Sequence, residues 1–251
     1  MLDEQLGATM FLAHPYRWPV IGWMGDIEGI SRAQCQEFFH TYYAPNNATL
    51  YLVGDFDTQE ALKLIEAAYG DISAGPAVPS VPTYEPEQRG ERRAFVRFPA
   101  QSQAVLYGFK APSATSPDLP VLDVLQYALS AGEGALLTQE LVYKQELAIS
   151  AMVDFGWRID PGLFMFFLDW SPGVSAEKGE KALLAVLDRV AKKGLTAAQL
   201  KRAKAMLKAR TLRELATRSS RANAMGTAEL LLGDWRRALD MADKYEAVTA
   251  E

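Results

Sequence analysis

Apolar and polar positions between residues 26 and 73 follow the pattern of a helix, a strand and a second helix. Ser31 begins a capping box, which opens a helix that Pro45 closes. The stretch 48–54 is rich in β-forming residues and ends at a glycine, so it predicts a strand. Asp57 then caps a helix whose apolar residues recur at helical spacing.

The clearest internal boundary lies at residues 74–93. This stretch contains four prolines and two glycines and shows no hydrophobic period. Such a composition predicts a semi-extended linker on the surface. We therefore expect a first unit at 1–73, the linker at 74–93 and a second unit at 94–251.

The second unit alternates pairs of strands with helices. Its pattern predicts strands at 93–99, 102–112, 147–157 and 162–172, and helices at 118–130, 135–145, 176–194, 196–218, 220–232 and from 235 onward. Strand pairs with hairpin-like connections followed by helices favour an α+β fold over a doubly wound parallel sheet. The first unit has too few strands for a sheet of its own, so we expect its domain to be truncated.

That truncation has a physical consequence for the predicted strand at 48–54. Without the other strands of its domain, this strand would present an unpaired edge. We expect the segment either to pack on the second unit or to make the chain self-associate, which would give a homodimer.

Composition and charge narrow the class of protein. The chain is 49% hydrophobic and 23% charged, and no apolar run reaches the roughly 18 residues of a membrane span. Acidic residues near the start replace the basic ones of a signal peptide, so we predict no targeting segment. The net charge is −5, yet residues 189–221 carry eleven Lys and Arg against one acid, Glu214. This stretch has no interleaved aromatic residues, so we expect a helix with a solvated basic flank and no nucleic-acid partner.

Candidate catalytic residues are few. The single cysteine, Cys35, lies in a helical pattern, and we expect it to be a packed thiol rather than a nucleophile. The two histidines, His14 and His40, belong to neither H-E-x-x-H nor H-x-x-E-H, and no G-x-S-x-G is present. His14 lies between two prolines in a loop, without neighbours that would complete a metal site. The sequence therefore predicts no catalytic residue and no metal ligand in this chain.

Four stretches, in order along the chain, resemble the pitrilysin-type (insulinase-family) zinc metallopeptidases. They are HPYRWPVIGWMGDIEGIS, FFHTYYAPNNATLYLVGDFD, ALLTQELVYKQELAISA and LTAAQLKRAKAMLKA. The tyrosine pair followed by Pro, Asn and a strand ending Val-Gly-Asp is the most specific of them. The resemblance implies two similar α+β domains joined by a linker in each half-molecule, with two halves closing around a peptide.

The resemblance also implies where zinc is bound. In that family the H-x-x-E-H ligands and a downstream Glu lie upstream of the HPY segment, and the Glu of the motif is the general base. We therefore expect no cofactor in this chain, with zinc held only by a missing catalytic domain or a partner subunit. The expected partners are a peptide substrate and the catalytic half of the same peptidase. Periplasm or cell envelope is the location that the resemblance suggests.

The chain departs from the family pattern in two places. Relatives carry Arg-Glu, then a Gly and an aromatic residue, where this chain has the run 143–149, and that change is typical of non-catalytic halves. Some members also grip substrate with an Arg and a Tyr seven positions apart. Here Arg236 and Arg237 precede Tyr245, but the nearest spacing is eight. We expect these three residues to contact substrate, with an exposed Arg and a helix-packed Tyr as the alternative.

Two functions from different classes remain open at this point. The first is the non-catalytic, chamber-forming part of a pitrilysin-like peptidase. The alternative is a scaffold or assembly subunit with the same fold, as in respiratory-complex core proteins and the inactive partners of processing peptidases.

Overall fold

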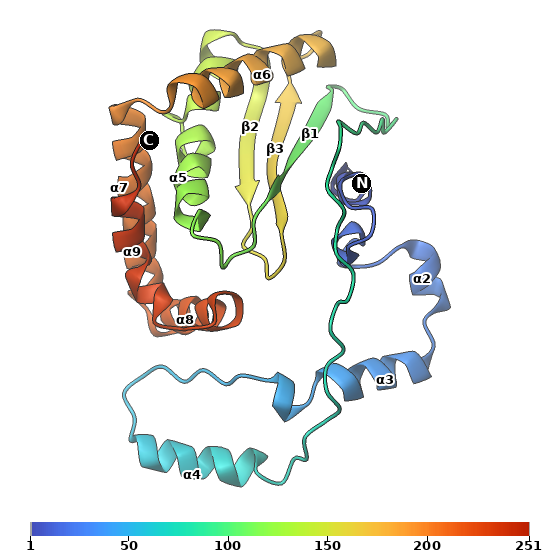
Figure 1. The fold of residues 1–251 in the computed structure, drawn as a ribbon, viewed down its shortest axis with the longest axis vertical. Coiled ribbons are helices and arrows are strands. Elements are labelled where there is room, and N and C mark those ends of the chain that lie inside the picture. The colour runs from blue at the N-terminus through green and yellow to red at the C-terminus, as the bar shows by residue number, and fades with distance from the viewer. Residues whose placement is uncertain (1, 251) are drawn as a thin grey trace.

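The computed structural model describes residues 2–250, and it is drawn in Figure 1. The N-terminal part is helical, with α1 (Leu2–Met10), α2 (Met24–Gly29), α3 (Arg32–Tyr42) and α4 (Thr58–Tyr69), and short 3-10 turns at Pro15–Arg17 and Pro45–Asn47. Three strands follow in the C-terminal part: β1 (Ala104–Ala111), β2 (Ala148–Phe155) and β3 (Gly162–Trp170). They are joined and followed by α5 (Leu119–Ser130), the π-helix η3 (Thr138–Lys144), α6 (Ala176–Lys193), α7 (Ala197–Glu214), α8 (Arg218–Leu232) and α9 (Arg237–Ala247).

The strands form one antiparallel sheet with the order β1-β3-β2. Tyr107 of β1 and Val153 of β2 both pair with Phe166 of β3, so these three side chains share the inner face of the sheet. Phe167 is paired with one residue of each outer strand in the same way, and these side chains share the opposite face. This strand–helix organisation confirms the α+β fold expected from the sequence.

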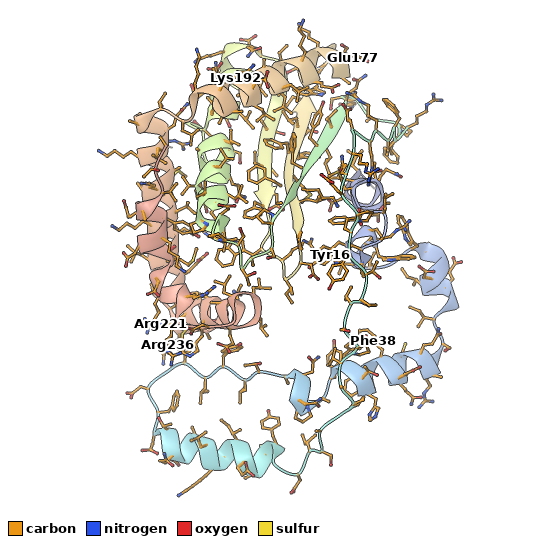
Figure 2. All side chains as sticks on the ribbon, viewed as in Figure 1. Tyr16, Phe38, Glu177, Lys192, Arg221 and Arg236 are labelled. Carbon is orange, nitrogen blue, oxygen red and sulfur yellow. The ribbon has the colours of Figure 1, made fainter. Side chains whose placement is uncertain are left out.

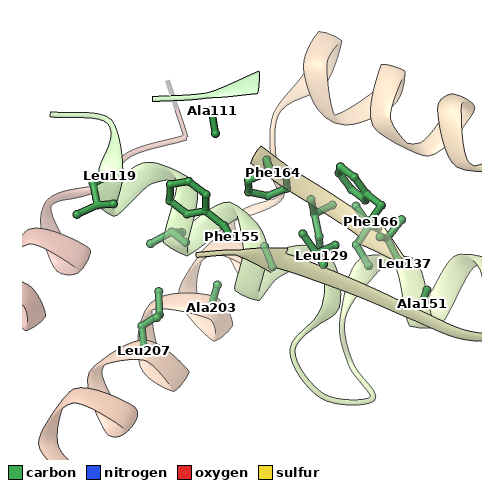
Figure 3. Packing of buried hydrophobic residues seen from close by; sticks show 14 of the residues in the cluster. Ala111, Leu119, Leu129, Leu137, Ala151, Phe155, Phe164, Phe166, Ala203 and Leu207 are labelled. Carbon is green, nitrogen blue, oxygen red and sulfur yellow. The ribbon is translucent and has the colours of Figure 1, made fainter. Parts of the chain in front are cut away.

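The main core lies between the inner face of the sheet and the helices that cover it, as the close-up in Figure 3 shows. Leu168 and Trp170 of β3 are fully buried there. Gly179 lets α6 approach, because a Cβ at this position would overlap with the indole of Trp170. The same cluster includes Leu207 of α7 and Met241 of α9, so the sheet and the C-terminal helices share one core.

The first residues of the chain pack on the opposite face of the sheet. Met10 and Phe11 form a second small cluster with Leu163 of β3. Glu85 of the 74–93 segment fixes the turn that follows, since its carboxylate accepts hydrogen bonds from the backbone N–H groups of residues 12, 13 and 14 at 2.8–3.0 Å. Partial burial alone would raise the pKa of Glu85, but these donors and Lys110 outweigh it and lower the pKa to about 2.

Two stretches that the sequence predicts as strands are not strands in the structure. Residues 48–54 and 93–99 have no ladder partner and are assigned to no strand. The prediction was wrong there because β propensity becomes a strand only when a neighbour supplies the hydrogen bonds. Part of 48–54 packs on the second unit instead, where the Tyr51 hydroxyl donates to the carbonyl of Gly226 in α8 at 3.4 Å.

The packed thiol expected at Cys35 is also a wrong prediction. Helix α3 forms with the predicted capping box at Ser31, but none of its residues is buried, and Cys35 is exposed. Helical spacing identifies which residues share a face, and it does not reveal whether anything covers that face.

The segment after η3 contains the one non-glycine residue with positive φ among residues 2–250. Glu146 has φ of 52°, in the left-handed region where a side chain crowds the backbone. It is exposed, and it lies in the run 143–149 that departs from the pattern of the resembling family. A residue with a side chain at this φ carries a local backbone strain.

Replacing Glu146 with glycine should stabilise the chain. We expect Glu146→Gly to raise the free energy of unfolding by about 1 kcal/mol, because glycine adopts this φ without the steric cost. Urea denaturation followed by circular dichroism measures it. The matched control is Gln145→Gly, at φ −99°, which should destabilise the chain. A Glu146→Gly variant no more stable than the parent would contradict the strain.

Candidate peptide-contact site

The three residues predicted to contact substrate lie at the start and near the end of α9. Arg236 is exposed, its guanidinium lies 4.8 Å from the centroid of the Trp235 ring, and it is 3.3 Å from an oxygen of Asp234. Arg237 is the exposed first residue of α9. Figure 2 shows Arg236 at the corner where α8 and α9 meet.

Tyr245 points in the other direction, into the protein. It is 5% exposed, and its hydroxyl donates a 2.8 Å hydrogen bond to Oδ2 of Asp123 in α5. Arg237 and Tyr245 are eight residues apart, about 12 Å along a helix axis, and one is exposed while the other is buried. The structure does not bring the two side chains to one surface. A substrate role for the arginines stays a prediction, and the burial of Tyr245 fits the packing alternative.

Asp123 is the centre of a buried polar network that sequence reasoning missed. Its carboxylate also accepts from Nε1 of Trp157, at 3.1 Å to Oδ1 and 3.2 Å to Oδ2. The network therefore links α5 to α9 and to the segment that follows β2. Burial raises the pKa of Asp123 to about 6, against the opposing effect of these two donors and of Arg210. Burial and the neighbouring Asp123 carboxylate likewise raise the pKa of Tyr245.

The histidines do not come together. His14 caps the 3-10 turn at residues 15–17, and it is 6% exposed. Its Nδ1 accepts from the backbone N–H of Tyr16, and its Nε2 lies 3.3 Å from Oδ2 of Asp160 in the β2–β3 connection. His40 is exposed on α3. Among residues 2–250 no group of three or more His, Cys, Asp and Glu side chains is arranged to hold a metal ion. His14 thus joins the N-terminal segment to the β2–β3 connection.

The two edges of the sheet differ in whether their outward backbone groups have hydrogen-bond partners, and the sequence pattern did not reveal this difference. The edge of β2 is covered at Val153, whose N–H donates to Oγ of Ser130 at 3.0 Å and whose carbonyl accepts from Gln126 of α5 at 3.1 Å. These two side chains occupy the positions that another strand would take. Residue 153 is therefore closed to strand addition.

The outer edge of β1 is open. The N–H of Trp170 donates to the carbonyl of Gln103, which identifies a hydrogen-bonded pair and makes every second pair after it a hydrogen-bonded one. Residues 105, 107, 109 and 111 therefore point their backbone groups at β3, and residues 104, 106, 108 and 110 point theirs outward. Within the described residues these outward groups have no hydrogen-bond partner. An extended peptide could pair there by strand addition.

The burial of Asp123 makes stability depend on pH. Because its pKa is raised in the folded chain, the folded state holds a proton that the unfolded state has lost, so stability falls as pH rises from about 4 to 6. We expect Asp123→Asn to remove about 2 kcal/mol of this dependence between pH 4.5 and 7.5, measured by urea denaturation.

The amide can still accept from Trp157 and donate to the tyrosine hydroxyl, so the fold should survive this substitution. The control is Asp154→Asn, at an exposed position on β2. Equal pH dependence in the parent and in Asp123→Asn would contradict the expectation.

Comparison with known proteins finds a family, curated relatives and solved structures that this chain resembles. Residues 29–207 match the family described as Peptidase M16 inactive domain. The zinc protease PqqE of Helicobacter pylori is 32% identical over 212 residues, which cover 83% of this chain and 48% of that protein. The crystal structure of a protease from Helicobacter pylori superposes with a TM-score of 0.94 at 28% identity, covering 100% of this chain and 61% of that one.

The same fold occurs in one chain of a solved complex. A chain in the structure of complex III2 from Candida albicans matches with a TM-score of 0.78 at 16% identity, covering 99% of this chain and 60% of that one. At that identity the likeness shows the fold only.

The chain spans about half the length of the curated relatives it matches, with 48% and 56% of two of them covered. No helix among residues 2–250 is long and apolar enough to cross a membrane. The family match extends from α2 to the middle of α7 and so includes both the 74–93 segment and the whole sheet. This chain belongs to the Peptidase M16 inactive-domain family, and it has relatives that are named zinc proteases.

Proposed function

We propose that this chain is the non-catalytic part of a pitrilysin-like zinc metallopeptidase and contributes peptide-binding surface to its chamber. The open outer edge of β1 is the observation that carries the peptide-binding part of the proposal. Its outward backbone groups at residues 104, 106, 108 and 110 have no partner among the described residues. An extended peptide pairing with them would be held by main-chain hydrogen bonds with little dependence on its side chains.

The relatives support the peptidase part of the proposal. Similar proteins are named zinc proteases, and this chain corresponds to about half of their length. We propose that a catalytic half, in the same polypeptide or in a partner subunit, holds the zinc ion and its general base. In this arrangement the present chain positions substrate and takes no part in the bond cleavage.

The scaffold alternative has one observation in its favour, the likeness in fold to a chain of complex III2. A scaffold would keep the fold without needing a peptide site. An H-x-x-E-H motif encoded upstream of residue 1 would support one fused peptidase, and a motif found only in a neighbouring gene would support an inactive partner subunit. Its absence from both would support the scaffold.

The chain by itself should show neither zinc-dependent catalysis nor stoichiometric zinc. We expect zinc analysis of the purified chain, after dialysis against trace zinc, to find far less than one ion per chain. Incubation with an unfolded protein substrate should give no cleavage. One zinc per chain together with proteolysis that EDTA abolishes would overturn the non-catalytic assignment.

Peptide binding at β1 can be tested with one pair of variants. Leu106→Pro removes an outward N–H but no hydrogen bond to β3, whereas Leu106→Ala removes side-chain contacts and keeps that N–H. Fluorescence anisotropy with labelled ten-residue peptides of β-forming, uncharged composition measures the Kd.

We expect Leu106→Pro to weaken binding about tenfold or more and Leu106→Ala to weaken it far less. Circular dichroism verifies that both variants fold. Equal binding by the parent and a folded Leu106→Pro variant would exclude this edge as the peptide site.

A further inference from the structure

A groove runs between α5 and α7 on the helical side of the domain. Its volume is about 490 Å³. It is lined by Tyr127 of α5, by Ala131 directly after that helix, and by Met206, Ala209, Arg210 and Arg213 of α7. The α7 residues are spaced by three, one and three positions, so they form one face of that helix along the groove. Helix α5 packs on β2 and α7 packs on α5, which separates this groove from the open edge of β1.

The floor of the groove is apolar and its rim is cationic. Ala131, Met206 and Ala209 contribute aliphatic surface without charge. Arg210 is exposed, donates to Oε1 of Glu214 at 2.7 Å and donates to the Tyr127 hydroxyl at 3.0 Å. Its charge therefore has a partner within the fold, and its guanidinium is held in place.

Arg213 differs from Arg210. It is exposed, and its side chain makes no hydrogen bond or ion pair with any residue that the structure describes. A guanidinium presents five donors in a planar fork that suits a carboxylate. Arg213 is thus a charged group beside an apolar groove with its donors free for a ligand.

A third guanidinium supports the end of the groove. Arg202 donates to the carbonyl of Ala131 at 2.6 Å and lies within 3.4 Å of the carbonyls of residues 127 and 128. These carbonyls are at the C-terminal end of α5, where the helix dipole is negative. Arg202 offsets that negative charge, which would otherwise repel an anion.

The charge around the groove is positive. Residues 189–221 contain eleven cations, and their only acid is Glu214, which is paired with Arg210. An anionic ligand therefore meets no unpaired carboxylate on α7. The lining has a single aromatic ring, Tyr127, and its hydroxyl is bound to Arg210, so there is no platform for stacking successive bases.

We propose that this groove binds an acidic peptide segment, with an aliphatic side chain on its floor and a carboxylate on Arg213. Charge complementarity and the apolar floor together select a peptide that carries both kinds of side chain. The proposal concerns a second surface of the chain and does not rest on peptide pairing at β1.

The test uses the 251-residue chain and three labelled eight-residue peptides of alternating sequence: Glu/Leu, Gln/Leu and Lys/Leu. Fluorescence anisotropy gives each Kd at low and at physiological salt. The variants are Arg213→Gln, which removes the free guanidinium, and Ala209→Glu, which adds a carboxylate to the floor. Lys201→Gln removes one positive charge from an exposed position of α7 outside the groove lining and is the matched control. Leu106→Pro tests whether the outer edge of β1 contributes to the binding of these peptides.

We expect the Glu/Leu peptide to bind at least about tenfold more tightly than the Gln/Leu and Lys/Leu peptides. Arg213→Gln and Ala209→Glu should each weaken it about fivefold or more, while Lys201→Gln changes the Kd less than twofold. Leu106→Pro should leave this binding unchanged, so that failure here is distinguishable from failure at the sheet edge.

Three results would overturn the proposal. One is equal weakening by Arg213→Gln and Lys201→Gln, which would reveal non-specific attraction to the basic helix. Another is equal affinity for all three peptides. The third is tighter binding of a single-stranded oligonucleotide than of the Glu/Leu peptide, together with weaker oligonucleotide binding by the Arg213→Gln variant. That result would assign the groove to nucleic acid.

Discussion

Strand pairing is the constraint on which the rest of this structure depends. β3 has a partner on both sides, and it contributes two fully buried residues of the core, Leu168 and Trp170. β2 has one strand partner, and side chains of α5 satisfy its other edge at Val153. β1 has one partner and an open edge, while 48–54 and 93–99 have none and are not strands. A segment of this chain forms a strand only where a neighbouring segment provides backbone hydrogen bonds. The open edge of β1 is where we propose that a peptide pairs.

The helices are held to this sheet by polar contacts as well as by the apolar core. The buried carboxylate of Asp123 in α5 accepts one hydrogen bond from Tyr245 of α9 and one from Trp157, which follows β2. These bonds attach the last helix to α5. On the other face, Glu85 and His14 attach the N-terminal segment through backbone amides and Asp160. In both places a titratable side chain (Asp123 on one face, Glu85 and His14 on the other) is wholly or largely buried and accepts hydrogen bonds from neighbouring groups.

Several helices of both units, and the paired strands of the second, were predictable from sequence because these elements carry their own signals. The capping residues Ser31 and Thr196 and the glycine after α6 determine helix ends locally, and the alternation in β3 reflects two faces that are both covered. Cys35 and the strand at 48–54 were mispredicted because their state depends on neighbours distant in sequence. The burial of Tyr245 depends on Asp123, which is 122 residues away in sequence, and no local pattern reports such a contact.

Hydrogen exchange at individual amides of β1, followed by NMR with and without a bound peptide, measures whether the outer edge of this strand is free to pair. In the free chain we expect fast exchange at residues 104, 106, 108 and 110 and slow exchange at 105, 107 and 109, whose amides are hydrogen-bonded to β3. A bound extended peptide should slow the first set and leave the second unchanged. Uniformly slow exchange along β1 in the free chain, or no protection of the outward amides when peptide is bound, would contradict this expectation.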